Sequence, residues 1–341
     1  MTFSRRSLLH LSVLSVACLW PAAQLAAQSM DELAAEAANG PPVVWYESSP
    51  EDQADAIIDA FNDRFPDVEI EHIRITGGNQ LAARAIQEVE ARGYTADVLT
   101  GGSDHIWSLN DRDVLLRTDF TEIGIDPALF PNDFTVATTA SVYMIVYNTS
   151  RMSADEVPTN WDEIVDARWA DRVGSWVRAA AFAQLSYAVG EDRAEALLQD
   201  FVQTRPLLFQ STFPMAQQVA AGEVDWAIGF YHTSQPPIAA GAPVALAPLD
   251  PTPMHTIYSS ISANAQNMAG AKLLLAWLAS PEGAIAYENA TQRGNPLVEG
   301  TRTQALVAGV ETSEWPPERI SEYSAISERF NGILAAVGEA R

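Results

Sequence analysis

The stretch that most constrains the fold is residues 43–75, because its apolar pattern changes from strand to helix and back to strand. Val43–Tyr46 is a short apolar run typical of a buried strand, and a polar turn follows at residues 47–50. Apolar side chains then recur at helical spacing before Pro66, at Ala54, Ile57, Ile58 and Phe61. Alternating apolar residues in 68–75 predict a second strand. This strand–helix–strand opening favours an α/β fold with a parallel sheet.

Small polar residues follow the strands in three turns, at 47–50, 77–79 and 101–104. Open α/β sheets bind small ligands at the carboxyl ends of their strands, and a helix N-terminus there favours an anion. The first part of the chain therefore offers these candidate ligand-binding residues: Tyr46, Ser48, Ser49, Gly78, Gly102 and Ser103. Their structural alternatives stay open, since serines cap helices, glycines form turns and a strand tyrosine packs against helices.

The N-terminus predicts export. Arg5 and Arg6 precede an apolar region that runs to about Cys18, and small residues follow up to Ala27. We interpret residues 1–27 as a signal peptide of the twin-arginine type, with an ordinary secretory signal as the alternative. The expected location is the periplasm. Lipid anchoring at Cys18 is a minor alternative, because the residues before it match a lipoprotein signal poorly.

Composition narrows the class of protein further. The 341 residues are 48% hydrophobic, enough for two domains or for one domain with two lobes. The formal net charge of −24 argues against binding to nucleic acid or to an anionic membrane. The only cysteine, Cys18, lies in the predicted signal peptide, so we expect a mature chain with neither a disulfide nor a cysteine-bound metal.

Two strands without an accompanying helix divide the rest of the chain. They lie at 142–148 and 255–262, and between them runs an α/β block with strands at 172–176 and 225–230. We therefore expect two crossovers, near 138–148 and 254–262, that form a hinge between two lobes. The expected boundaries are 42–138 with 262–341 for lobe 1, and 139–261 for lobe 2. Helices are predicted at 179–189, 192–203, 215–221, 269–279, 281–290 and 321–336.

Several segments, in this order and spacing, resemble the periplasmic solute-binding proteins of ABC importers, in particular the ferric-iron-binding-like group. Besides the opening 43–70, they are 96–99, Tyr147-Asn148-Thr149, Trp161-Asp162-Glu163-Ile164, 219–225, 271–273 and 280–283. The resemblance covers nearly all of the mature chain. It implies a type II periplasmic-binding-protein fold, with a mixed sheet flanked by helices in each lobe and two crossover strands as the hinge. It also implies a solute captured between the lobes and a permease in the inner membrane as the partner.

The ligand implied by the family is ferric iron, but the family's iron ligands are largely replaced. Pro50 stands about where a histidine is usual, Gly102 about where an acid is usual, and Tyr231-His232 replaces a tyrosine pair. We therefore expect a small organic or phosphorylated anion held by hydroxyls and backbone N–H groups. Iron, or an iron chelate, is the alternative, and Tyr231 and Tyr46 would then be its phenolate ligands.

The second part of the chain adds further candidates: Ser175, Arg178, Thr212, Tyr231, His232 and Tyr258. Arg178 suits a carboxylate or phosphate, because its planar fork matches two oxygens. A surface ion pair is its structural alternative. Tyr231 and His232 follow a strand directly, and Tyr258 lies on the second crossover, where packing is the alternative role.

An exported α/β enzyme is the rival class. The chain has no G-x-S-x-G, H-E-x-x-H or G-x-x-x-x-G-K motif, and its five histidines are scattered. The sequence thus favours a monomeric receptor that has no cofactor and no catalytic residues.

Overall fold

The computed structural model describes residues 27–339. Cys18 and all of the predicted signal peptide except residue 27 lie outside the described residues. Eight strands follow one another along the hydrogen-bonded sheet. In spatial order they are β2 (Ile70–Arg74), β1 (Val43–Glu47), β3 (Val98–Gly102), β9 (Thr252–Ile261), β4 (Val136–Asn148), β7 (Trp226–Phe230), β5 (Val173–Trp176) and β6 (Leu207–Phe209). Outside this order, β8 (Val244–Ala247) pairs with β4, and β10 (Thr312–Ser313) pairs with β9.

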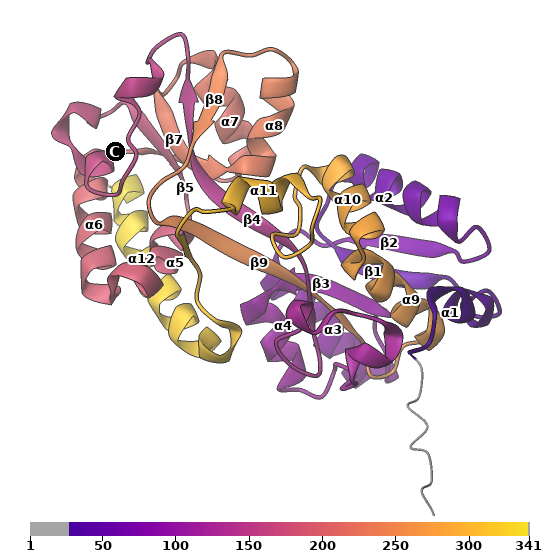
Figure 1. Ribbon diagram of the computed structural model, residues 1–341. Coiled ribbons are helices and arrows are strands. Elements are labelled where there is room, and N and C mark those ends of the chain that lie inside the picture. Colours follow the sequence, from indigo (N-terminus) through magenta and orange to yellow (C-terminus); the bar gives the residue numbers. More distant parts are fainter. Residues whose placement is uncertain (1–26, 340–341) are drawn as a thin grey trace, which may run out of the picture.

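The strands β4 and β9 join the two halves of the molecule. Residues 136–142 of β4 pair with β9, whereas residues 143–148 pair with β7 and β8. β9 in turn pairs with β3, so both strands run from one half into the other (Figure 1). The two predicted crossover strands are therefore confirmed, and the fold is two-lobed. All 13 residues of β4 are buried.

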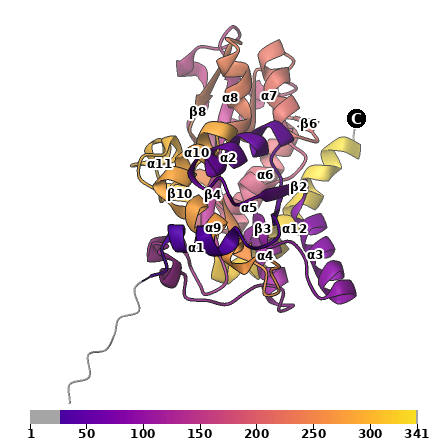
Figure 2. The same cartoon turned by 90° about the vertical axis from the view of Figure 1, so that its right-hand side faces the viewer.

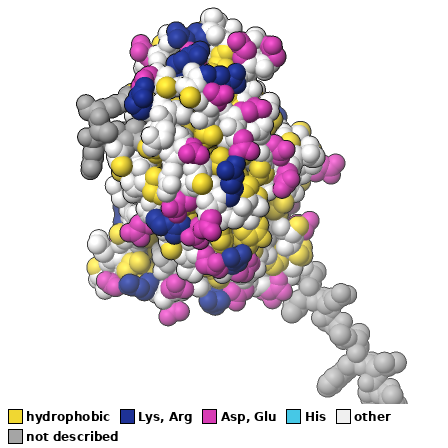
Figure 3. All heavy atoms as spheres, turned by 90° about the vertical axis from the view of Figure 1, so that its left-hand side faces the viewer, with side chains coloured by type: hydrophobic (Ala, Val, Ile, Leu, Met, Phe, Trp, Pro, Cys, Tyr) yellow, Lys and Arg dark blue, Asp and Glu magenta, His cyan; other side chains and the backbone are white. Residues whose placement is uncertain are grey.

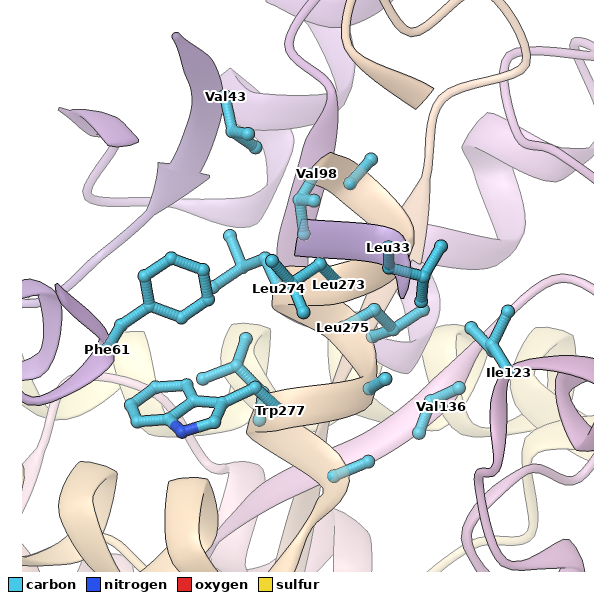
Figure 4. Close-up of a cluster of buried hydrophobic side chains, with 14 of the residues drawn as sticks. Leu33, Val43, Phe61, Val98, Ile123, Val136, Leu273, Leu274, Leu275 and Trp277 are labelled. Atoms are coloured by element: carbon cyan, nitrogen blue, oxygen red, sulfur yellow. The ribbon is translucent and has the colours of Figure 1, made fainter. Parts of the chain in front are cut away.

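Lobe 1, as we define it, consists of β1–β3 with α1 (Met30–Ala37), α2 (Glu51–Arg64), α3 (Gly78–Arg92), α4 (Ser103–Asn110), α9 (Met268–Ala279) and α10 (Pro281–Thr291). Figure 2 views this lobe from its outer side, where α10 packs against α2. The predicted apolar stripe of α2 is buried, and the rings of Phe61 and Trp277 meet edge-to-face with centroids 5.3 Å apart. Figure 4 shows these two rings beside Leu274 in the core.

Lobe 2 consists of β5–β8 with α5 (Ala180–Val189), α6 (Glu191–Gln203), α7 (Thr212–Ala221) and α8 (Tyr231–Ala239). Its core contains the aromatic rings of Phe182, Phe201 and Trp226, which pack against one another at tilted angles. The segment around Trp161 and Trp169 forms only short 3-10 turns, at Glu163–Val165 and Ala167–Trp169. Further 3-10 turns lie at Phe120–Ile123, Pro127–Leu129, Ala154–Glu156 and Pro317–Arg319.

The last helix, α12 (Ile320–Glu339), packs in lobe 2 rather than in lobe 1, to which the sequence assigns residues 262–341. Its buried side chains, Tyr323, Ile326, Phe330 and Leu334, recur every three or four residues and form one stripe. The stripe belongs to the core of lobe 2. The helix itself lies against α5 and α6, at the yellow end of the chain in Figure 1. After α11 (Arg302–Val307), residues 308–319 therefore pass between the lobes for a third time. No helix within residues 27–339 is long and apolar enough to cross a membrane.

Candidate functional site

A cavity of about 880 Å³ lies between the two lobes, and both contribute to its walls. Lobe 1 provides the polar turns that follow β1, β2 and β3, together with Arg293 from the loop after α10. The crossover strand β4 provides Tyr143, and lobe 2 provides Trp176, Arg178 and Phe230. Helix α12 adds a row of polar side chains. The lining polar residues of these turns and of α12 are Ser48, Thr76, Asn79, Thr100, Asp104, His105, Ser108, Ser324, Ser327, Glu328 and Asn331. We call this cavity the cleft.

On the lobe 1 side of the cleft, two imidazole rings lie directly against glycines. These rings leave no room for a side chain at either position. A Cβ on Gly78 would come within 1.9 Å of Nδ1 of His105, and a Cβ on Gly102 within 2.7 Å of Nε2 of His255. The Nδ1 atom of His105 lies 2.7 Å from a carboxylate oxygen of Asp104. Burial by itself raises the pKa of Asp104, but His105 outweighs it, and the pKa of this carboxyl is lowered. Asp104 is therefore ionised and paired at neutral pH.

His255 is the second imidazole of the cleft, and it stays neutral. Burial lowers its pKa, and the nearby Asp104 only partly opposes this effect. Its ring stacks on Tyr323 of α12, and its Nδ1 lies 3.3 Å from the side-chain amide of Gln184. His255 belongs to β9, so it links a crossover strand to α12 at the cleft wall.

An aromatic wall covers the lobe 2 side of the cleft. The rings of Tyr143 and Phe230 lie 4.4 Å apart, and those of Trp176 and Phe230 lie 5.9 Å apart. The guanidinium carbon of Arg178 lies 5.0 Å above the Trp176 ring, which positions this cation beside the wall. The cleft thus places an aromatic surface next to a positive charge.

Two arginines of the cleft differ from most of the described arginines in their partners. Most described arginines pair with a carboxylate, as in Arg64–Asp31, Arg151–Asp225 and Arg329–Glu191. Figure 3 shows acidic and basic side chains interspersed over one face of the molecule. In residues 27–339, neither Arg178 nor Arg293 has a carboxylate within 4.0 Å. In a chain with 44 acidic residues, this leaves two cations of the cleft available to an anion.

Arg293 also contacts lobe 2. Its Nη2 lies 3.0 Å from Nε2 of His232, the second residue of α8. His232 is buried, and burial, followed by the charge of Arg293, lowers the pKa of its imidazole well below the usual value. His232 is therefore neutral, and its ring stacks on Phe230 with centroids 5.2 Å apart.

Four of the residues proposed from the sequence line the cleft: Ser48, Gly78, Gly102 and Arg178. Tyr46 does not, because its hydroxyl lies inside lobe 1 and donates to Glu88 at 2.9 Å. Burial and then Glu88 raise the pKa of this phenol. Ser49 is buried beside Glu47, which accepts its backbone N–H.

The remaining candidates also lie outside the cleft lining. Ser103 and Thr212 are buried first residues of α4 and α7, and Ser175 is buried within β5. Tyr231 and His232 open α8 behind Phe230, so that His232 reaches the cleft only through Arg293. Tyr258 packs against Trp107 with ring centroids 5.5 Å apart, and burial raises the pKa of its phenol. Within residues 27–339, no three His, Cys, Asp or Glu side chains converge as metal ligands.

Sequence reasoning missed Tyr143, His255, Arg293, Tyr323 and the polar residues of α12. Tyr143 and His255 belong to the crossover strands, so their place in the predicted hinge could have indicated them. The polar side of α12 carried a signal in its serines at residues 321, 324 and 327, but only its packing brings it to the cleft. Arg293 lies in a loop without a recognisable motif.

Comparisons with known proteins agree with this architecture. Residues 56–307 match the family model of the bacterial extracellular solute-binding proteins. No curated protein matches the sequence. The iron-bound HitA of Pseudomonas aeruginosa is similar in structure, with a TM-score of 0.73 and 18% identity over 87% of this chain and 100% of HitA.

Two further solved structures bind other solutes. The Atu4243 GABA receptor has a TM-score of 0.68 and 18% identity over 86% of this chain and 98% of that one. AfuA of Actinobacillus pleuropneumoniae, solved with fructose 6-phosphate, has a TM-score of 0.61 and 21% identity over 81% and 88% of the two chains. At these identities the likeness establishes a shared two-lobed fold.

Proposed function

Since this chain belongs to the family of bacterial extracellular solute-binding proteins, which serve ABC importers, we propose that its solute is a small organic or phosphorylated anion. The solute binds in the cleft between the lobes and is delivered to a permease in the inner membrane. We further propose that the chain is exported by the twin-arginine route, acts in the periplasm as a monomer and carries out no catalysis.

One observation carries the choice of an anion. Arg178 and Arg293 face the cleft and, among the described residues, have no carboxylate within ion-pair distance. A guanidinium fork matches the two oxygens of a carboxylate or phosphate, and such charge-assisted hydrogen bonds are about twice as strong as neutral ones. The hydroxyl of Ser48 and the backbone at Gly78 and Gly102 add uncharged polar groups on lobe 1. The aromatic wall beside Arg178 suits an organic body attached to the anion.

The architecture supports capture by closure of the lobes. We propose that lobe 1 comprises residues 42–138 with the segment from 262 to about 307, and lobe 2 comprises residues 139–261 with α12. The hinge then lies in β4, β9 and residues 308–319. A few chain crossings of this kind let two rigid lobes rotate about a bound solute.

Ferric iron is the second candidate, because the similar HitA structure holds iron. Neither of its two expected phenolate ligands faces the cleft. The Tyr46 phenol donates to Glu88 inside lobe 1, and Tyr231 lies outside the cleft lining. Arg293 and Arg178 would also repel a trivalent cation at the cleft. We therefore place the anion first.

A thermal-shift screen tests the proposal. The panel contains fructose 6-phosphate and other sugar phosphates, phosphonates, carboxylates such as citrate, and γ-aminobutyrate, with polyamines as the group of opposite charge. An anion at about a hundred times its Kd adds about 2.7 kcal/mol of stability, which raises the Tm by several degrees. A panel in which no anion raises the Tm, or in which only polyamines do, contradicts the proposal.

A further inference from the structure

Arg293 occupies a position where the two lobes meet at the edge of the cleft. It follows α10 in lobe 1, whereas the residue it contacts, His232, belongs to α8 in lobe 2. An arginine side chain only donates hydrogen bonds, so Nε2 of His232 is the acceptor at 3.0 Å. The neutral ring then carries its proton on Nδ1. This contact joins the lobes through one cation and one neutral imidazole.

The guanidinium of Arg293 has an N–H donor that the contact with His232 does not use. Its Nε is buried and has no hydrogen-bond partner within the described part of the chain. A buried donor without a partner costs about 1–3 kcal/mol, and more when the group is charged. Arg293 lines the cleft, so an acceptor bound there is placed to complete its hydrogen bonds.

The carboxylate whose charge acts on Arg293 is already occupied by other donors. Glu47 accepts the hydroxyl of Tyr287 at 2.8 Å and the backbone N–H of Ser49. Burial raises the pKa of Glu47, but His72 and then Arg293 outweigh it and hold the pKa at about 2. The negative charge of Glu47 thus attracts the guanidinium of Arg293. The two groups form no ion pair, because they lie more than 4.0 Å apart.

We propose that Arg293 binds the anionic group of the solute through the guanidinium edge that His232 leaves free, and that it thereby couples anion binding to closure of the lobes. The inference rests on the proposed function and names the residue through which the anion acts. With the anion in place, the guanidinium is held at both edges, by the solute and by His232 of the opposite lobe. Its rigid fork makes this double contact possible, whereas the single ammonium of a lysine does not reproduce it.

The test uses four variants of the full chain, each compared with the wild type by far-UV circular dichroism to establish that it folds. Arg293→Lys keeps the charge and removes the fork, and His232→Phe keeps a ring and removes the acceptor. His232→Gln restores an acceptor oxygen. Arg112→Lys is the matched control, since Arg112 is exposed, lies outside the cleft lining and has no carboxylate within 4.0 Å among the described residues.

Isothermal titration with fructose 6-phosphate, citrate and γ-aminobutyrate measures affinity, and small-angle X-ray scattering measures the decrease in the radius of gyration on binding. Arg293→Lys should weaken the anion bound by the wild type at least tenfold, and Arg112→Lys should not. His232→Phe should diminish the decrease in radius, and His232→Gln should recover it.

The outcomes separate the two hypotheses. Unchanged affinity in Arg293→Lys, or a wild-type decrease in radius in His232→Phe, overturns this inference and leaves the proposed function standing. A wild-type protein that binds none of the three probes contradicts the proposed function, and the inference fails with it.

Discussion

The imidazole of His105 occupies the space in which a side chain at residue 78 would begin, since a Cβ on Gly78 would lie 1.9 Å from Nδ1 of that ring. This contact joins the turn after β2 to the first turn of α4, and both face the cleft. The same Nδ1 atom lies 2.7 Å from a carboxylate oxygen of Asp104. The position of His105 at the cleft therefore requires that residue 78 has no Cβ.

We expect Gly78→Ala to displace His105 and to lower the free energy of unfolding by about 1–3 kcal/mol, the usual cost of overpacking. Urea denaturation measures this change. The control is Gly332→Ala, because a Cβ there meets nothing within 4 Å and the residue lies in α12. Alanine is the better helix former, so the control should gain up to about 1 kcal/mol. Equal effects of the two substitutions would refute the packing argument.

Arg178→Ala should weaken an anionic solute by tenfold or more, because the loss of a charged hydrogen bond costs about 1.5–3 kcal/mol. Titration calorimetry with the best anion of the thermal-shift screen measures the change. Arg112→Ala removes an equal charge outside the cleft lining and should leave the affinity unchanged. If both variants bind like the wild type, Arg178 does not belong to the binding site.

Glu314 should make stability depend on pH near neutrality. It lies in the third crossover, where its carboxylate accepts the backbone N–H and the hydroxyl of Thr256 on β9. Burial raises the pKa of this carboxyl from 4.5 to about 7, although these hydrogen bonds oppose the shift. The folded state therefore holds the proton more tightly than the unfolded chain does. Its stabilising effect is full below pH 4.5, declines between pH 4.5 and 7, and is lost above pH 7.

Glu314→Gln imitates the protonated carboxyl at every pH. Relative to the wild type, the variant should gain up to about 3 kcal/mol of unfolding free energy as the pH rises from 4.5 to 8. Denaturant unfolding of both proteins at several pH values provides the comparison. Parallel curves for the two proteins would show that Glu314 does not titrate in this range.

Binding of iron by a tyrosine would be detected by an absorption band. Burial and the hydrogen bond to Glu88 raise the pKa of the Tyr46 phenol, and this opposes the deprotonation that a phenolate ligand requires. We expect purified protein mixed with ferric citrate to remain without a tyrosinate-to-iron absorption band. Appearance of that band would support iron, and its loss in Tyr231→Phe would identify the ligand.

The four residues proposed from the sequence that line the cleft share one property: they follow strands. Ser48, Gly78, Gly102 and Arg178 lie just after β1, β2, β3 and β5, or at the end of one of these strands, and parallel strands bring their carboxyl ends to one edge. The crossover strands were predictable as well, because an apolar run without a helix beside it is unusual in an α/β chain.

The errors have equally local causes. Tyr46 immediately precedes the last residue of β1, and its ring packs in a hydrophobic cluster of lobe 1 instead of the cleft. Whether a strand residue faces a cleft or a core is decided by the helices that cover it, and a sequence pattern does not contain that information. Arg293 and the polar face of α12 reach the cleft through contacts between residues far apart in the chain. No local signal marks such contacts.

The stripe of α12 has a consequence for the order in which the protein is made. Phe330 and Leu334 fill the core of lobe 2, whose strands and other helices all precede residue 248. During synthesis the ribosome must therefore produce the whole return segment of lobe 1 before lobe 2 receives its last core side chains. Lobe 1 begins first and lobe 2 is completed last, so the surfaces of α5 and α6 that α12 covers stay exposed on the nascent chain until α12 has been made.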